Sequence, residues 1–134
     1  MSPFDSAMSS AHASIVVGWV TMVGGVISGS IIGLLFHNAD WLGGYNSFRR
    51  RLVRLAHIAF FGIGILNILF GLSATALSLN PDAVRIGSTA LMIAAVAMPL
   101  NCLLTAWREP FRHLFFIPVL AVTVGIISIL IGWR

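Results

Sequence analysis

One stretch, from Phe48 to Gly71, constrains the fold of this chain more than any other. It opens with four arginines and then, from Leu55, continues without Asp, Glu, Lys or Arg until Asp82. About 20 consecutive apolar residues are enough to cross the hydrocarbon core of a bilayer as a helix. The stretch therefore predicts a transmembrane helix with a strongly basic end.

The composition extends this prediction to the whole chain. Of the 134 residues, 58% are hydrophobic and 9% are charged, whereas soluble domains carry about 25% charged residues. The mean hydropathy of +0.98 indicates a surface suited to lipid. At roughly 20 residues per crossing there is room for about four helices. We predict an all-α integral membrane protein, a four-helix transmembrane bundle that forms a single domain over residues 1–134.

The helix boundaries are expected where polar and turn-forming residues interrupt the apolar runs. Residues 38–46, 80–82 and 108–112 are such interruptions. Residues 1–12 are small and polar and are expected to be loosely held. Pro99 and Pro118 fall inside the third and fourth expected helices, where proline removes a backbone hydrogen bond and is expected to cause kinks. The expected helices span about 13–36, 51–77, 84–107 and 114–133.

The arginines predict the orientation in the membrane. Six of the eight flank the first and third connections, and only Arg85 and Arg134 lie toward the opposite side. Basic residues are retained on the cytoplasmic side, so both termini are expected on the non-cytoplasmic side of a cell membrane, of the bacterial inner-membrane type. Because the arginines lie at the ends of apolar runs, they do not suggest nucleic-acid binding; they suit topology and anionic lipid headgroups. These six are Arg49, Arg50, Arg51, Arg54, Arg108 and Arg112.

Each expected helix also has a face of small or polar residues at three- and four-residue spacing. Such residues let helix backbones approach closely within lipid. Asn67 is expected to hydrogen-bond between helices. Whether the face from Gly25 to Gly33 meets a helix of this chain or of a partner is left open by the sequence. The packing candidates are Gly25, Gly29, Gly33, Gly64, Asn67, Gly71, Gly125, Ser128 and Gly132.

Familiar catalytic arrangements are absent from the sequence. The four acidic residues lie in expected loops or at the N-terminus, and the lone Cys102 offers neither a disulfide within the chain nor a metal-ligand spacing. We therefore expect no catalytic activity of the chain itself and predict no metal site.

His57 is the histidine that lies clearly inside an apolar segment. Measured from the arginines, His57 lies about 5 Å and Asn101 about 10 Å inward at 1.5 Å per residue, so the two side chains could meet. His37 and His113 lie toward the same side. Two imidazoles on different helices can ligate a b-type haem, and one can bind a metal or hydrogen-bond a quinone; a packed neutral histidine is the simpler alternative. The candidate cofactor-binding residues are His57, Asn101, His37 and His113.

Three functions agree with these features. The first is an accessory or structural subunit of a larger membrane complex. The second is a membrane redox protein that holds haem b or a quinone near His57. The third is a small-solute transporter or channel that needs an oligomer to build its pore. The expected partners are membrane lipids and other integral membrane proteins or copies of this chain, and no nucleic acid is expected.

Overall fold

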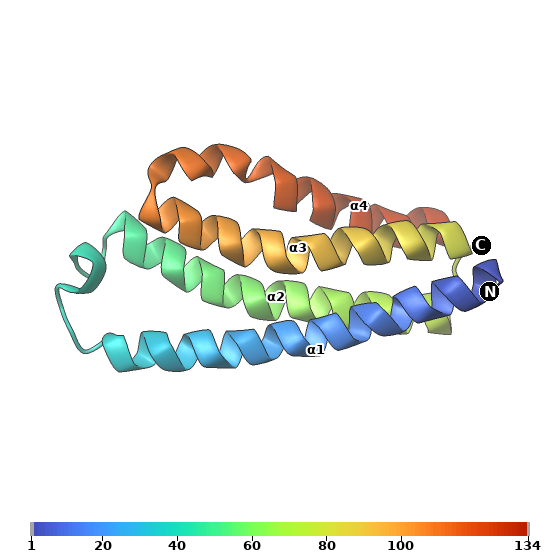
Figure 1. Cartoon of the computed structure of the whole chain (residues 1–134), viewed down its shortest axis with the longest axis horizontal. Helices are drawn as coiled ribbons and strands as arrows, with labels where there is room; N and C mark the ends of the chain where they lie inside the picture. Colours follow the sequence, from blue (N-terminus) through green and yellow to red (C-terminus); the bar gives the residue numbers. More distant parts are fainter. Residues whose placement is uncertain (1, 134) are drawn as a thin grey trace.

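Four long helices dominate the fold, as the sequence predicts. The computed structural model describes residues 2–133, and in this range four helical spans are long and apolar enough to cross a membrane, the fourth running from Glu109 to Gly132. This is the architecture of a multi-pass membrane protein (Figure 1). The helices are α1 (Pro3–Leu35), α2 (Phe48–Ala76), α3 (Pro81–Trp107) and α4 (Phe116–Gly132), and the short 3-10 helices are η1 (Trp41–Gly43) and η2 (Glu109–Leu114).

The start of α1 differs from the prediction. The helix begins at Pro3 and not near Ala13, because Ser2 and Asp5 form a capping box. The Ser2 hydroxyl accepts the Asp5 N–H at 3.1 Å, and the Asp5 carboxylate accepts the Ser2 N–H at 3.0 Å. Ala7 and Ala11 are buried. For residues 2–12 the prediction of a loosely held segment is therefore wrong; Met1 lies outside the described residues.

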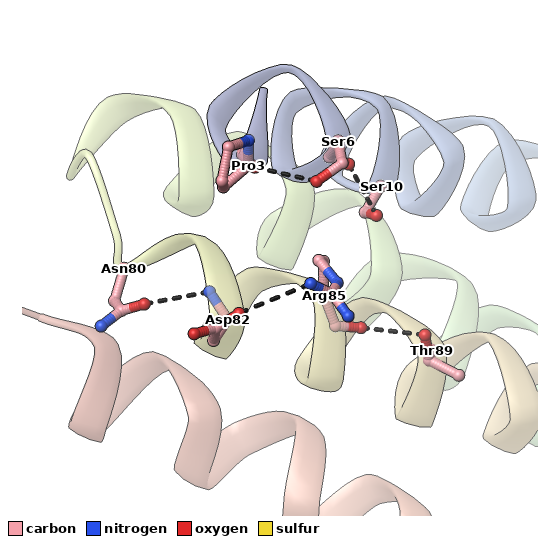
Figure 2. Close-up of polar contacts among 7 residues, drawn as sticks. All are labelled: Pro3, Ser6, Ser10, Asn80, Asp82, Arg85 and Thr89. Carbon is pink, nitrogen blue, oxygen red and sulfur yellow. Dashed lines mark hydrogen bonds and ion pairs between the residues drawn. The ribbon is translucent and has the colours of Figure 1, made fainter. Parts of the chain in front are cut away.

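Both inner helices begin at side-chain caps. The Ser47 hydroxyl accepts the Arg50 N–H at 3.1 Å, so α2 starts at Phe48, slightly before the predicted Arg51. The Asn80 side chain accepts the Asp82 N–H at 2.9 Å, and Pro81 occupies the first turn of α3. Figure 2 shows this polar end of α3 beside the first turns of α1, including the Arg85–Asp82 ion pair at 3.5 Å.

The two prolines within the predicted helices have different positions in the structure. Pro118 lies in the first turn of α4, which begins at Phe116 after η2. A first-turn N–H has no intrahelical partner, so proline is tolerated there, and the prediction that Pro118 kinks a helix interior is wrong. Pro99 is buried inside α3, which continues through it.

The four helices form an open arrangement. Each packs against its neighbours in sequence, and α1 also packs on α3, but α4 packs on α3 with little contact to α2. α1 and α4 lie at opposite edges of the molecule (Figure 1). One side of α3, between these edges, is therefore left without a helical partner among the described residues. We call the end that carries the 36–47 connection and η2 the arginine end; the chain termini lie at the opposite, terminal end.

Candidate functional site

A groove at the arginine end contains His57. α2 forms its floor, the last turns of α1 form one wall, and α3 contributes a single residue to the other. Its volume is about 210 Å³. Apart from one serine and one histidine, all the lining side chains are apolar. The lining residues are Ser28, Ile31, Ile32, Val53, Ala56, His57, Phe60 and Leu103.

Two hydrogen bonds of Ser28 favour one tautomer of His57. The Ser28 hydroxyl lies 2.9 Å from the Gly25 carbonyl oxygen and 3.1 Å from His57 Nδ1. A hydroxyl has one proton and can also accept. Both bonds form when Ser28 donates to Gly25 and accepts from Nδ1–H. In the neutral ring, Nε2 then carries a lone pair, and no described residue hydrogen-bonds to it.

The imidazole ring is also held sterically. A Cβ at Gly29 would lie 2.6 Å from His57 Cε1, so only glycine lets the ring lie this close to α1. On α2, the Phe61 ring meets the imidazole edge-on, with 5.4 Å between centroids. The ring is thus held by a hydrogen bond on Nδ1 and by packing on two sides; Nε2 also lies near α1, 3.3 Å from a Cβ built at Gly29, and has no hydrogen-bond partner among the described residues.

Asn101 does not meet His57. Its buried side-chain amide donates to the Phe111 carbonyl at 2.9 Å and accepts the Phe115 N–H at 3.0 Å. Residues two apart on a helix point about 200° away from each other. Because Leu103 lines the His57 groove, Asn101 faces the opposite way, toward η2. The prediction that His57 and Asn101 could meet considered only depth along the helices and not the direction of the side chains, and it is wrong. Asn101 instead fastens η2 to α3.

The other two histidines also lie outside the groove. His37 is exposed just beyond α1, with Nδ1 2.7 Å from the Leu34 carbonyl oxygen. His113 is exposed on η2. Over residues 2–133, no group of three or more His, Cys, Asp or Glu side chains could hold a metal ion. His57 is therefore the one candidate cofactor ligand that lines this groove.

Arg50 differs from the other arginines of the predicted headgroup cluster. It is only 2% exposed, and its guanidinium carbon lies 4.4 Å from the Phe36 ring centroid and 5.4 Å from those of Trp41 and Tyr45. It donates to the carbonyls of Phe36 at 3.0 Å and Ala39 at 3.4 Å. We call this set of contacts the Arg50 clasp, because it holds the 36–47 connection against α2.

The remaining five arginines stay at the molecular surface. Arg54 is half-buried, with its guanidinium carbon 4.9 Å from the Tyr45 ring centroid. The other four are exposed and could reach lipid headgroups: Arg49, Arg51, Arg108 and Arg112.

Most of the predicted packing residues lie at tight helix contacts. A Cβ at Gly71 would lie 2.5 Å from the Ala11 carbonyl oxygen, and one at Gly64 would lie 2.9 Å from that of Gly18. Gly33 has no neighbour within 4 Å. Asn67 on α2 donates to the Leu91 carbonyl of α3 at 3.0 Å. The other contacts are Gly25 on Phe61, Gly29 on His57, Gly125 on Leu91 and Gly132 on Ala83, while the buried Ser128 donates to Val124 of its own helix.

Sequence reasoning missed a serine cluster near the terminal end. The Ser88 hydroxyl donates to the Ser10 carbonyl at 2.7 Å, and the Ser14 hydroxyl lies 2.7 Å from that of Ser88. Serine in membrane helices also bonds to carbonyls of its own helix, as Ser10 does. The residue type alone therefore gives no signal that Ser14 and Ser88 link α1 to α3.

Known proteins give no further indication of the role of this site. No protein-family model, no curated protein and no solved structure matches the chain. The function is therefore inferred from the residues and their arrangement.

Proposed function

We propose that this chain is a small accessory subunit of a larger membrane complex, in which a transmembrane helix of a partner packs along α3. In this proposal the protein lies in a cell membrane with the arginine end in the cytoplasm and both termini on the other side. The observation that carries the proposal is the open side of α3 between the edges formed by α1 and α4.

A single exposed stripe runs along this side of α3. Its residues recur at alternating three- and four-residue spacing, the pattern of a helix–helix seam. Hollows of about 360 and 580 Å³ lie over it, and the smaller hollow reaches Val124 of α4. We call this surface the α3 stripe: Ile86, Thr89, Ile93, Val96, Leu100, Leu103 and Trp107.

The way helices associate in lipid explains why the α3 stripe suits a partner helix. Apolar side chains gain little from leaving lipid for another apolar surface, so membrane helices associate through close van der Waals fit. A narrow seam recessed between two flanking helices allows a partner helix more van der Waals contact than an isolated convex helix does. A partner helix is therefore a better occupant of the α3 stripe than mobile acyl chains.

Site-specific photo-crosslinking in native membranes tests this function. Val96 on the α3 stripe and Leu130 on α4 are both 66% exposed, so a photoreactive amino acid at either position meets its surroundings equally. We expect the Val96 position to cross-link to a larger membrane protein and the Leu130 position to give mainly lipid adducts. Lipid adducts alone at both positions would overturn the proposal, and a cross-link to a second copy would replace it with a homo-oligomer.

The haem and channel alternatives receive less support. A haem with two imidazole ligands needs a second histidine in the groove, but His37 and His113 lie outside it. A pore requires a polar lining, and Thr89 is the one polar residue of the α3 stripe.

A further inference from the structure

We propose that the His57 groove binds the ring of a membrane-soluble hydroquinone, with His57 Nε2 accepting a hydrogen bond from the ring hydroxyl. The groove lies mainly between α1 and α2 and shares one residue, Leu103, with the α3 stripe, so its ligand is proposed separately from the subunit role. The proposal assigns a ligand class and a redox-state preference to the groove without assigning a reaction.

The lone pair on Nε2 is the feature that selects the ligand. Ser28 gives its proton to the Gly25 carbonyl and accepts from Nδ1–H, so the neutral ring can act through Nε2 only as an acceptor. An acceptor in apolar surroundings that finds no donor costs free energy. The groove therefore favours a ligand that brings a donor.

The depth of His57 narrows the choice of donor. The residue lies one turn beyond Arg54 on α2, about 5 Å closer to the membrane centre at 1.5 Å per residue. The ester and acyl groups that glycerol lipids place below their headgroups offer no hydrogen-bond donor. A hydroquinone dissolves in the acyl region and carries its hydroxyl there.

The shape and lining of the groove suit a single ring. A space of about 210 Å³ is of the size of one ring and smaller than a fused four-ring sterol. Phe60, Ala56 and Leu103 give the ring apolar walls, and Ile31 and Ile32 continue along α1 toward lipid, where an isoprenoid tail can follow. His57 supplies the one polar contact that fixes the orientation of the ring, as expected for a mostly apolar ligand site.

The fixed tautomer predicts a preference between redox states. A hydroquinone hydroxyl can donate to Nε2, whereas the carbonyl of the oxidised quinone would place two acceptors together. A mismatched polar pair of this kind weakens binding roughly 5- to 140-fold, so the hydroquinone should bind more tightly than the quinone by a factor in this range.

Binding measurements in lipid nanodiscs test the inference. The full chain is titrated anaerobically with a short-tailed hydroquinone and, separately, with the corresponding quinone, and ¹⁵N NMR of the histidine rings reports the His57 tautomer. We expect Nε2 to be unprotonated in the free protein and to shift on hydroquinone binding. His57→Ala should abolish binding, while His37→Ala, which alters an exposed histidine outside the groove, should leave it unchanged.

Ser28→Ala gives a second and gentler test. The substitution removes the acceptor that holds the proton on Nδ1 while keeping the α1–α2 packing, so Nε2–H becomes accessible and the preference for hydroquinone over quinone should fall about tenfold or reverse. Failure of the wild-type protein to bind hydroquinone would overturn the inference, as would a Ser28→Ala protein with an unchanged preference. Equal binding of diacylglycerol or a sterol would show a general hydroxyl-binding groove and would also overturn it.

Discussion

At the scale of single residues, glycine decides how closely α1 and α2 approach. Gly71 lies directly beneath the carbonyl of Ala11, and Gly64 lies against Gly18. By contrast, a Cβ at Gly62 on the same helix would meet no neighbouring atom within 4 Å. The two kinds of glycine look alike in the sequence but differ in what a methyl group would meet.

Gly71→Ala should therefore destabilise the protein. The new Cβ would lie 2.5 Å from the backbone oxygen of Ala11, so α1 and α2 must separate locally, at a cost of about 1–3 kcal/mol for overpacking. Gly62→Ala is the matched control and should be neutral or slightly stabilising, since alanine favours helix. Unfolding by SDS titration in mixed micelles measures both; equal losses for the two variants would contradict this account of the interface.

At the scale of elements, the connection between α1 and α2 depends on one buried cation. Backbone freedom at Gly43 and Gly44, with φ of 88° and 92°, lets the chain reverse direction. The Arg50 clasp then fastens the turn through three aromatic rings and two carbonyls. Cation–π contacts contribute about 0.5–2 kcal/mol each, with the larger values in desolvated sites.

Replacing Arg50 by Met should loosen this connection while the helices remain. We expect faster amide hydrogen exchange across residues 36–47 and little change in the centre of α2. Arg50→Lys should restore little of the protection, because an ammonium lacks the planar face and the paired donors of a guanidinium. Arg49→Met, at an exposed neighbouring position, serves as the control. Equal exchange in the Arg49 and Arg50 variants would show that the clasp does not hold the loop.

At the scale of the whole molecule, the distribution of arginines predicts the orientation. The reporter is a single cysteine labelled with a membrane-impermeant maleimide, in a Cys102→Ser background that removes the buried natural thiol. Asp82→Cys, at the terminal end, should be labelled in intact cells. Arg112→Cys, at the arginine end, should be labelled only after the membrane is made permeable. The reverse pattern would place the arginine end outside the cytoplasm.

The sequence was sufficient to predict the four long helices, but not which neighbouring element each side chain faces. Long apolar runs between turn-forming clusters predicted four helices, because length and hydropathy are the main requirements for crossing lipid. The early start of α1 was missed although Ser2 and Asp5 carry the spacing of a capping box. The depths of His57 and Asn101 were estimated from rise per residue, yet Asn101 faces η2 and Ser28 is the partner of His57. These contact partners depend on how each helix is rotated about its axis relative to its neighbours. A single sequence with apolar residues on every helix face does not specify that rotation.

The unequal lengths of the outer helices have a consequence for the surrounding bilayer. α1 has 33 residues and α4 has 17, or about 50 Å and 25 Å of helix at 1.5 Å per residue, and they stand at opposite edges of the molecule (Figure 1). A hydrocarbon layer of about 30 Å therefore meets a long continuous helix at one edge and, at the other, a short helix that crosses it only together with η2, as the span Glu109–Gly132. Each ångström of mismatch costs a fraction of a kcal/mol, so we expect the two edges to prefer bilayers of different local thickness. We expect such an asymmetric boundary to favour one rotation of the molecule in the membrane plane, with α1 toward the thicker part of the bilayer.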